Sequence, residues 1–128
     1  MIDIWVLNAL QGKELKIFGN ENKTLDFTYI DDFIEGILLV MNQKNEVYDL
    51  SSGKATKLTG VADYIISLAG GGSKCFELPE MAQPQEVELD ISKIKAQGYS
   101  PRVDIFEGVR KTFDWYKRNF EEIMRDRD

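Results

Sequence analysis

Three aspartates near the start of the chain could bring carboxylates to one site. They are Asp26, Asp31 and Asp32, and clustered carboxylate oxygens are typical ligands of Ca²⁺ and Mg²⁺. Asp31 and Asp32, however, stand at the start of an apolar run with helical spacing, where a helix needs side chains to cap its free N–H groups. We therefore interpret these two residues as helix caps and predict no metal site.

The side chains most used in proton transfer and zinc binding are scarce. The sequence contains no histidine and a single cysteine, Cys75. Without histidine, neither a serine triad nor a zinc hydrolase centre can be assembled in its usual form. One cysteine forms neither an internal disulfide nor a multi-cysteine metal site. We expect Cys75 to be an ordinary small side chain rather than a reactive thiol, and we predict no catalytic residue in this chain.

Charge and hydropathy exclude further classes of protein. Sixteen Lys and Arg against 22 Asp and Glu give a net charge of -6, the wrong sign for a surface that neutralises phosphate backbones, so nucleic acid is not an expected partner. The longest apolar run, Ile37 to Met41, is far shorter than the roughly 20 residues that cross a bilayer. The Met1 end also lacks the layout of a signal peptide, and we expect a cytoplasmic protein without membrane contact.

Periodicity in the sequence indicates the elements that must position a site. Apolar spacing predicts helices over 2–10, 30–41, 58–69 and 90–98 and from 104 onward, and alternation predicts strands over 14–18, 27–29, 46–50 and 76–78. Asp32 with Glu35, and Asp104 with Glu107, form capping-box patterns. With 128 residues, of which 43% are hydrophobic, we expect one mixed α/β domain over 1–128.

Four segments, taken in order, resemble the later half of the extended short-chain dehydrogenase/reductase family, the NAD-dependent epimerases, dehydratases and decarboxylases of nucleotide sugars. The most specific segment is 24–32, TLDFTYIDD, which is similar to the family's Thr-Arg-Asp-Phe run followed by an aromatic, an aliphatic and paired aspartates. The other three are 9–19, 47–53 and 90–116. Their order and spacing extend the resemblance over nearly the whole chain.

The resemblance implies a small carboxyl-terminal, substrate-binding portion of a two-part enzyme whose Rossmann half is absent from this chain. No glycine-rich turn leads from a strand into a helix, because Gly70 to Gly72 follow a helix instead. No tyrosine is followed four positions on by a lysine, the family's catalytic pair. We therefore expect the chain alone to be inactive and to bind no cofactor. For the full-length enzyme the resemblance implies NAD(P) as the cofactor. It also implies a role in carbohydrate metabolism, with a nucleotide-activated sugar as the substrate.

Two positions are candidates for substrate binding. The resemblance assigns Phe18 to the nucleoside side of the pocket, although a phenylalanine that ends a strand is as often part of the core. Leu25 stands where many family members carry an arginine that binds a substrate phosphate, and the stretch 83–89 adds no basic residue. An alternative is therefore a non-catalytic binding or assembly module that retains the fold.

The helix predicted over 30–41 has an unusually wide apolar surface. At the Leu38-Leu39-Val40 end of the helix, Leu39 and Val40 extend this surface beyond a single stripe. The resemblance implies that the missing Rossmann half covers this end of the helix. Uncovered, such a surface favours self-association, so we expect a homo-oligomer or a large exposed apolar patch.

Overall fold

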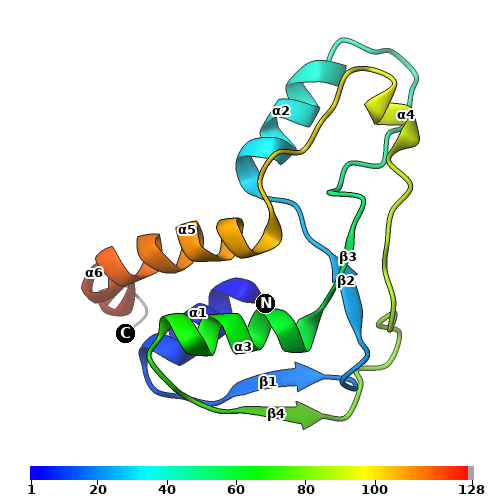
Figure 1. The fold of residues 1–128 in the computed structure, drawn as a ribbon. Helices are drawn as coiled ribbons and strands as arrows, with labels where there is room; N and C mark the ends of the chain where they lie inside the picture. Colours follow the sequence, from blue (N-terminus) through cyan, green and yellow to red (C-terminus); the bar gives the residue numbers. More distant parts are fainter. Residues whose placement is uncertain (127–128) are drawn as a thin grey trace.

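The computed structural model describes residues 1–126 and confirms a mixed α/β architecture (Figure 1). Its elements in chain order are α1 (Ile2–Leu10), β1 (Leu15–Phe18), β2 (Thr24–Asp26), α2 (Ile30–Val40), β3 (Ala55–Lys57), α3 (Leu58–Leu68), β4 (Lys74–Glu77), α4 (Ser92–Lys95), α5 (Ile105–Arg118) and α6 (Phe120–Arg125). No helix in this range is long and apolar enough to cross a membrane.

The main core lies where α1, α3 and α5 pack together beside a parallel pair of strands, β1 and β4 (Figure 1). The register of this pair places Leu15 opposite Lys74 and Phe18 opposite Glu77. The indole Nε1 of Trp5, on α1, donates to the carbonyl oxygen of Lys16 at 2.9 Å and ties the helix to β1. The buried apolar residues of this core are Trp5, Val6, Ala9, Leu15, Ile17, Leu58, Val61, Ala62, Ile65, Val109 and Phe113.

A second, smaller group of elements lies at the other end of the molecule, where α2 and α4 meet (Figure 1). Its buried centre is Ile91, Ile94 and Tyr99, against which Val40, Tyr48 and Leu50 pack. The antiparallel pair β2 and β3 runs between this group and the main core. The strand β2, which carries Leu25, leads from the end of the main core toward α2.

Most of the predicted helices and one predicted strand are confirmed, and the strand predicted over 76–78 overlaps β4 but begins two residues earlier, at Lys74. The helices over 2–10, 30–41 and 58–69 and the strand over 14–18 match α1, α2, α3 and β1 within a residue. Asp104 is the N-cap of α5, and its carboxylate accepts from the N–H groups of Phe106 and Glu107. The last helix is shorter than predicted, because the chain breaks at Asn119 before α6.

Two predicted strands are wrong. The extended segment expected over 27–29 lies three residues earlier, at β2, because Phe27 to Tyr29 lead directly into α2. The segment 46–50 alternates as expected, with Tyr48 and Leu50 toward the smaller core and Val47 exposed, but it pairs with no strand among residues 1–126. The strand β3 was not predicted from the pattern, since Ala55, Thr56 and Lys57 carry no apolar alternation.

Candidate functional site

A cavity of about 530 Å³ opens between α1, β1 and β2. Both substrate candidates, Phe18 and Leu25, line it, so the structure brings together two residues that are separated in the sequence by a turn. The other lining residues are Met1, Ile4, Trp5, Asn8, Lys16, Lys23, Leu58, Glu80 and Gln83. The cavity thus combines an aromatic and aliphatic wall with two ammonium groups and one carboxylate.

Phe18 lies on the outer face of β1. Along this strand Leu15 and Ile17 are buried while Lys16 and Phe18 face outward, as the pleat of a strand requires. The Phe18 side chain is 39% exposed. Its ring is therefore a wall of the cavity and is not part of the buried core.

Leu25 lies at the middle of β2, opposite Thr56 of β3. Its side chain is half-buried and packs against the main core while it also borders the cavity. The position is consequently a boundary between core and cavity.

Lys23 is the residue of this cavity that sequence reasoning missed. Its side chain is only 3% exposed, and its ammonium donates to the carbonyl oxygen of Phe18 and to Oε1 of Gln83, each at 2.8 Å. A buried lysine is costly unless its donors are paired. No periodic pattern marks Lys23, because its burial follows from the way the turn after β1 folds back on itself.

The charges at the cavity are partly balanced. The Glu77 carboxylate accepts a hydrogen bond from Lys16, with the two charged atoms 3.0 Å apart, and this raises the pKa of the Lys16 ammonium. The carboxylate of Glu80 also borders the cavity. Lys23, by contrast, forms no ion pair in the described part of the chain; its two partners are neutral oxygens.

Asp26, next to Leu25, anchors β2 to two loops. Its carboxylate accepts from the hydroxyl of Ser52 at 2.5 Å and from the N–H groups of Gly53 at 3.0 Å and Leu89 at 3.3 Å. Burial alone would raise the pKa of Asp26, but hydrogen bonds from Ser51, Ser52 and Leu89 outweigh it and hold the pKa below its ordinary value. Asp26 therefore fixes the neighbourhood of the cavity and does not point into it.

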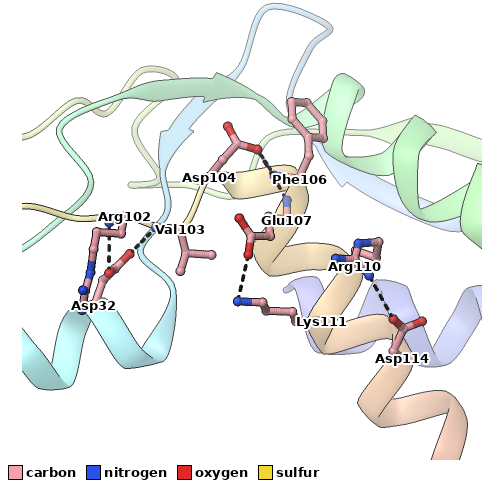
Figure 2. A network of polar contacts seen from close by, with 9 residues as sticks. All are labelled: Asp32, Arg102, Val103, Asp104, Phe106, Glu107, Arg110, Lys111 and Asp114. Atoms are coloured by element: carbon pink, nitrogen blue, oxygen red, sulfur yellow. Dashed lines mark hydrogen bonds and ion pairs between the residues drawn. The ribbon is translucent and has the colours of Figure 1, made fainter.

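The prediction that Asp31 and Asp32 cap their helix is wrong. Tyr29 is the N-cap of α2, with no side-chain cap bond. Asp32 is buried and instead accepts from the N–H groups of Arg102 at 3.1 Å and Val103 at 2.9 Å, a contact drawn in Figure 2. Asp32 thus holds the segment before α5 against α2. Within residues 1–126 no cluster of metal-ligating side chains is present.

The first turns of α5 carry their own polar network (Figure 2). The Glu107 carboxylate lies 2.9 Å from the ammonium of Lys111, and Arg110 lies 3.6 Å from Asp114. Both pairs are exposed and join residues one helical turn apart. Pairs of this kind stabilise a helix only slightly, and because both partners of each pair lie on α5 the network brings no second element to a site.

Cys75 lies on β4, away from the cavity. A hydrogen bond with the Glu14 carboxylate raises the pKa of its thiol above the ordinary value. Because the thiolate is the reactive form, this environment disfavours nucleophilic chemistry at Cys75.

Comparison with known proteins gives a family similarity over the first part of the chain. The model of the NAD dependent epimerase/dehydratase family matches residues 1–51. This range includes Phe18, Leu25 and the whole of α2.

Individual relatives match over nearly the whole chain. A provisionally assigned UDP-glucose 4-epimerase of Methanocaldococcus jannaschii is 31% identical over 120 residues, which are 93% of this chain and 39% of that protein. UDP-glucuronic acid decarboxylase 1 of Xenopus tropicalis is 29% identical over 94% of this chain and 30% of its own length. The chain therefore spans well under half of the relatives it matches.

Solved structures of the same kind share the fold. The UDP-glucose 4-epimerase of Thermotoga maritima, solved with UDP-glucose, has a TM-score of 0.85 and 25% identity over 93% of this chain and 40% of its own. The UDP-glucuronic acid 4-epimerase of Bacillus cereus, solved with UDP-glucuronic acid and NAD, has a TM-score of 0.83 and 28% identity over 92% of this chain and 40% of its own. The fold of this chain is thus one part of the fold found in nucleotide-sugar epimerases.

Proposed function

We propose that this chain is the substrate-binding, carboxyl-terminal portion of an NAD(P)-dependent nucleotide-sugar epimerase or dehydratase. The observation that carries the proposal is the convergence of Phe18 and Leu25 on one cavity, in a chain whose fold matches part of such enzymes. The substrate class is a nucleoside diphosphate sugar. The ring of Phe18 packs on the nucleoside base, and the Lys23 end of the cavity faces the diphosphate.

The residues of the chain position the substrate and exclude water from it. Trp5 and Phe18 provide apolar walls that favour burial of a base, and Leu25 borders the part of the cavity assigned to the diphosphate. The ammonium of Lys23 keeps the turn after β1 closed and holds the backbone of Phe18 at the end of that strand. Binding and orientation are the contribution of this portion, and hydride transfer belongs to the NAD(P)-binding part of the enzyme.

The residues present do not fit an NAD(P) site. A dinucleotide needs a glycine-rich turn that leads from a strand into a helix, so that helix N–H groups meet the pyrophosphate. The run Gly70 to Gly72 does the opposite, since it leads from α3 into β4. We therefore assign the cofactor to a separate Rossmann part.

Exposed apolar surface supports the need for that part. On α2, Phe33 is 38%, Ile34 47%, Ile37 44% and Leu38 59% exposed. A surface of this kind is covered by a partner in most proteins. Where the Rossmann part is missing, the same surface favours association of two copies of this chain into a homo-oligomer.

The alternative is a binding or assembly module without catalytic function. It is favoured by Leu25, which offers no donor to a phosphate, and by Glu88, whose carboxylate is engaged with the N–H of Ala55 at 3.0 Å. The coding sequence upstream of Met1 separates the two. A Rossmann half with a Tyr-x-x-x-Lys pair there supports the enzyme, and its lack supports the module.

The direct test is a nuclear magnetic resonance titration of the 128-residue chain with UDP. We expect saturable shifts at Phe18, Lys23 and Leu25, and weaker binding in Phe18→Ala. Base stacking on an aromatic ring contributes roughly 1–3 kcal/mol, so affinity should fall about five- to a hundredfold. Phe76→Ala is the matched control, because Phe76 is also exposed but lies on β4 outside the cavity. No saturable shift, or an equal loss in both variants, would refute the proposal.

A further inference from the structure

The outer edge of β4 carries backbone groups without partners. Among residues 1–126, β4 pairs with β1 and with no other strand. The N–H of Leu15 donates to the carbonyl oxygen of Ser73 at 3.0 Å, so Ser73 and the residues two and four positions on turn their backbone groups toward β1. The residues between and after them turn their N–H and C=O groups outward, and no hydrogen bond joins these groups to the described chain. These residues are Lys74, Phe76 and Leu78.

Apolar side chains lie along the same edge. Phe76 is 48% and Leu78 87% exposed. Phe76 lies beside Ile17, which is buried in the main core, so Phe76 belongs to the core face of the sheet and the helices stop short of it. Most strand edges are protected by a charge or by a covering segment. Here the ammonium of Lys74 is already paired with Asp63 of α3, and the two apolar side chains stay open.

We propose that two copies of this chain pair along β4, antiparallel and about a two-fold axis at Phe76, so that their two-stranded sheets join into one. Such an axis keeps the core faces of both copies on the same side, and only residues of the same face can then lie opposite each other. Phe76 faces its counterpart in the second copy. Lys74 faces Leu78, and Cys75 faces Glu77.

This register uses the edge more completely than its neighbours do. Phe76 exchanges both backbone hydrogen bonds with its counterpart, and Lys74 exchanges both with Leu78, so every outward group of the edge is paired. Two rings directly across a strand pair also attract each other. An axis at Cys75 would leave Leu78 beyond the start of the partner strand. An axis at Glu77 would place two carboxylates directly opposite each other, which is destabilising.

The position and the charge of the edge favour a second copy as its partner. The strand β4 lies at the end of the molecule opposite α2 (Figure 1), so a Rossmann part that covers α2 leaves this edge open, and the inference does not rest on the proposed function. Each chain carries a net charge of -6. At the edge itself, however, Glu77 is paired with Lys16 and Lys74 with Asp63, so the surfaces that meet are locally neutral.

Disulfide trapping in the 128-residue chain tests the register. Glu77→Cys places a thiol opposite Cys75 of the second copy in a pair without hydrogen bonds, where the Cα atoms of opposed residues lie roughly 4.5 Å apart. A disulfide spans this distance, so under oxidised glutathione we expect more than about half of the chain to migrate as a linked dimer without reductant. Lys74→Cys is the control, because its thiol lies on the other face of the sheet from Cys75. In that variant and in the parent, less than about a tenth should be linked.

Sedimentation measures the association itself. Leu38→Glu is present in every sample, so that association through the apolar surface of α2 is removed, and physiological salt screens charges beyond about 8 Å. We expect a reversible dimer that Phe76→Lys weakens at least about tenfold, since it replaces the paired rings with two opposed cations. Trp115→Lys changes a residue that is 50% exposed on α5 and should have less than about a twofold effect. UDP binding should be unchanged in Phe76→Lys, because Phe76 lies outside the cavity.

Four results would overturn the inference. They are a folded Glu77→Cys variant that forms no linked dimer, equal linkage in Glu77→Cys and Lys74→Cys, linkage in the parent, and a chain with Leu38→Glu that stays monomeric or is weakened equally by Phe76→Lys and Trp115→Lys. If Glu77→Cys does not fold, sedimentation alone decides. Failure of UDP to bind the parent would refute the proposed function and leave the pairing of β4 standing.

Discussion

The ammonium of Lys23 donates to the backbone carbonyl of Phe18 across 2.8 Å, from a side chain that is only 3% exposed. This contact closes the turn between β1 and β2. It therefore sets the distance between Phe18, at the end of the first strand, and Leu25, in the middle of the second. The geometry of the candidate cavity therefore depends on Lys23, a residue whose burial no periodic pattern in the sequence indicates.

Replacing Lys23 with methionine should destabilise the protein. The variant loses two hydrogen bonds from a charged donor, to Phe18 and to Gln83, each of which contributes roughly 1.5–3 kcal/mol. Urea denaturation measures the loss. Lys13→Met is the control, since Lys13 is exposed and the variant should unfold at nearly the same urea concentration as the parent. Equal stability of the two variants would show that the buried ammonium does not hold the turn.

The contribution of Asp26 to stability should depend on pH. Its pKa is lowered in the folded state, so the carboxylate stabilises the protein fully above the pKa of an unfolded aspartate, about 4. As the pH falls through the lower folded pKa this contribution is lost. The difference in unfolding free energy between the parent and Asp26→Asn should therefore be constant at neutral pH and shrink below about pH 4. A difference that does not change with pH would contradict the assigned shift.

Removing the cap of α5 should have a measurable but modest cost. Asp104→Ala leaves the N–H groups of Phe106 and Glu107 without their acceptor, and the loss of such a cap costs about 1 kcal/mol. Asp114→Ala is the matched control on the same helix, because the Asp114 carboxylate forms an exposed pair with Arg110 at 3.6 Å, which contributes little. Thermal unfolding of both variants gives the comparison. A lower melting temperature for Asp104→Ala than for Asp114→Ala indicates loss of the cap, whereas equal melting temperatures indicate a general effect of removing a charge.

The isolated chain should bind no NAD(H) and catalyse no epimerisation or hydride transfer. It lacks the strand-to-helix glycine turn that holds a dinucleotide, and Gly70 to Gly72 cannot replace it. Calorimetric titration with NAD⁺ and NADH is the measurement. Saturable micromolar binding would mean that a cofactor site is built from residues outside the expected motif.

Features encoded by neighbouring residues could be predicted from the sequence. The boundaries of α1 and α3 follow from apolar spacing over a few turns, and the cap at Asp104 follows from its position just before such a run. Leu25 and Phe18 were placed at a common site only through the family resemblance, since apolar residues of this kind carry no chemical signal of their own.

Features that depend on distant contacts could not be predicted in this way. The partner of Asp32 is the backbone of Arg102 and Val103, 70 residues away in the first case, so a capping pattern at Asp32 was misleading. The burial of Lys23 requires the folded turn and Gln83 from another loop. The alternation over 46–50 correctly indicated which side chains face inward, but a strand also needs a neighbour, and among residues 1–126 it has none.

The affinity of Leu25→Arg for UDP tests most directly whether the cavity beside Leu25 receives the diphosphate of a nucleotide sugar. A leucine cannot donate to phosphate oxygens, whereas an arginine can do so with two parallel bonds. One such contact contributes roughly 1.5–3 kcal/mol, so the variant should bind UDP about ten- to a hundredfold more tightly. Ala55→Arg adds the same charge at an exposed position outside the cavity and should change the affinity much less. A Leu25→Arg variant that melts early, as expected of an unpaired guanidinium forced into the core, and that shows no gain in UDP affinity would contradict the account.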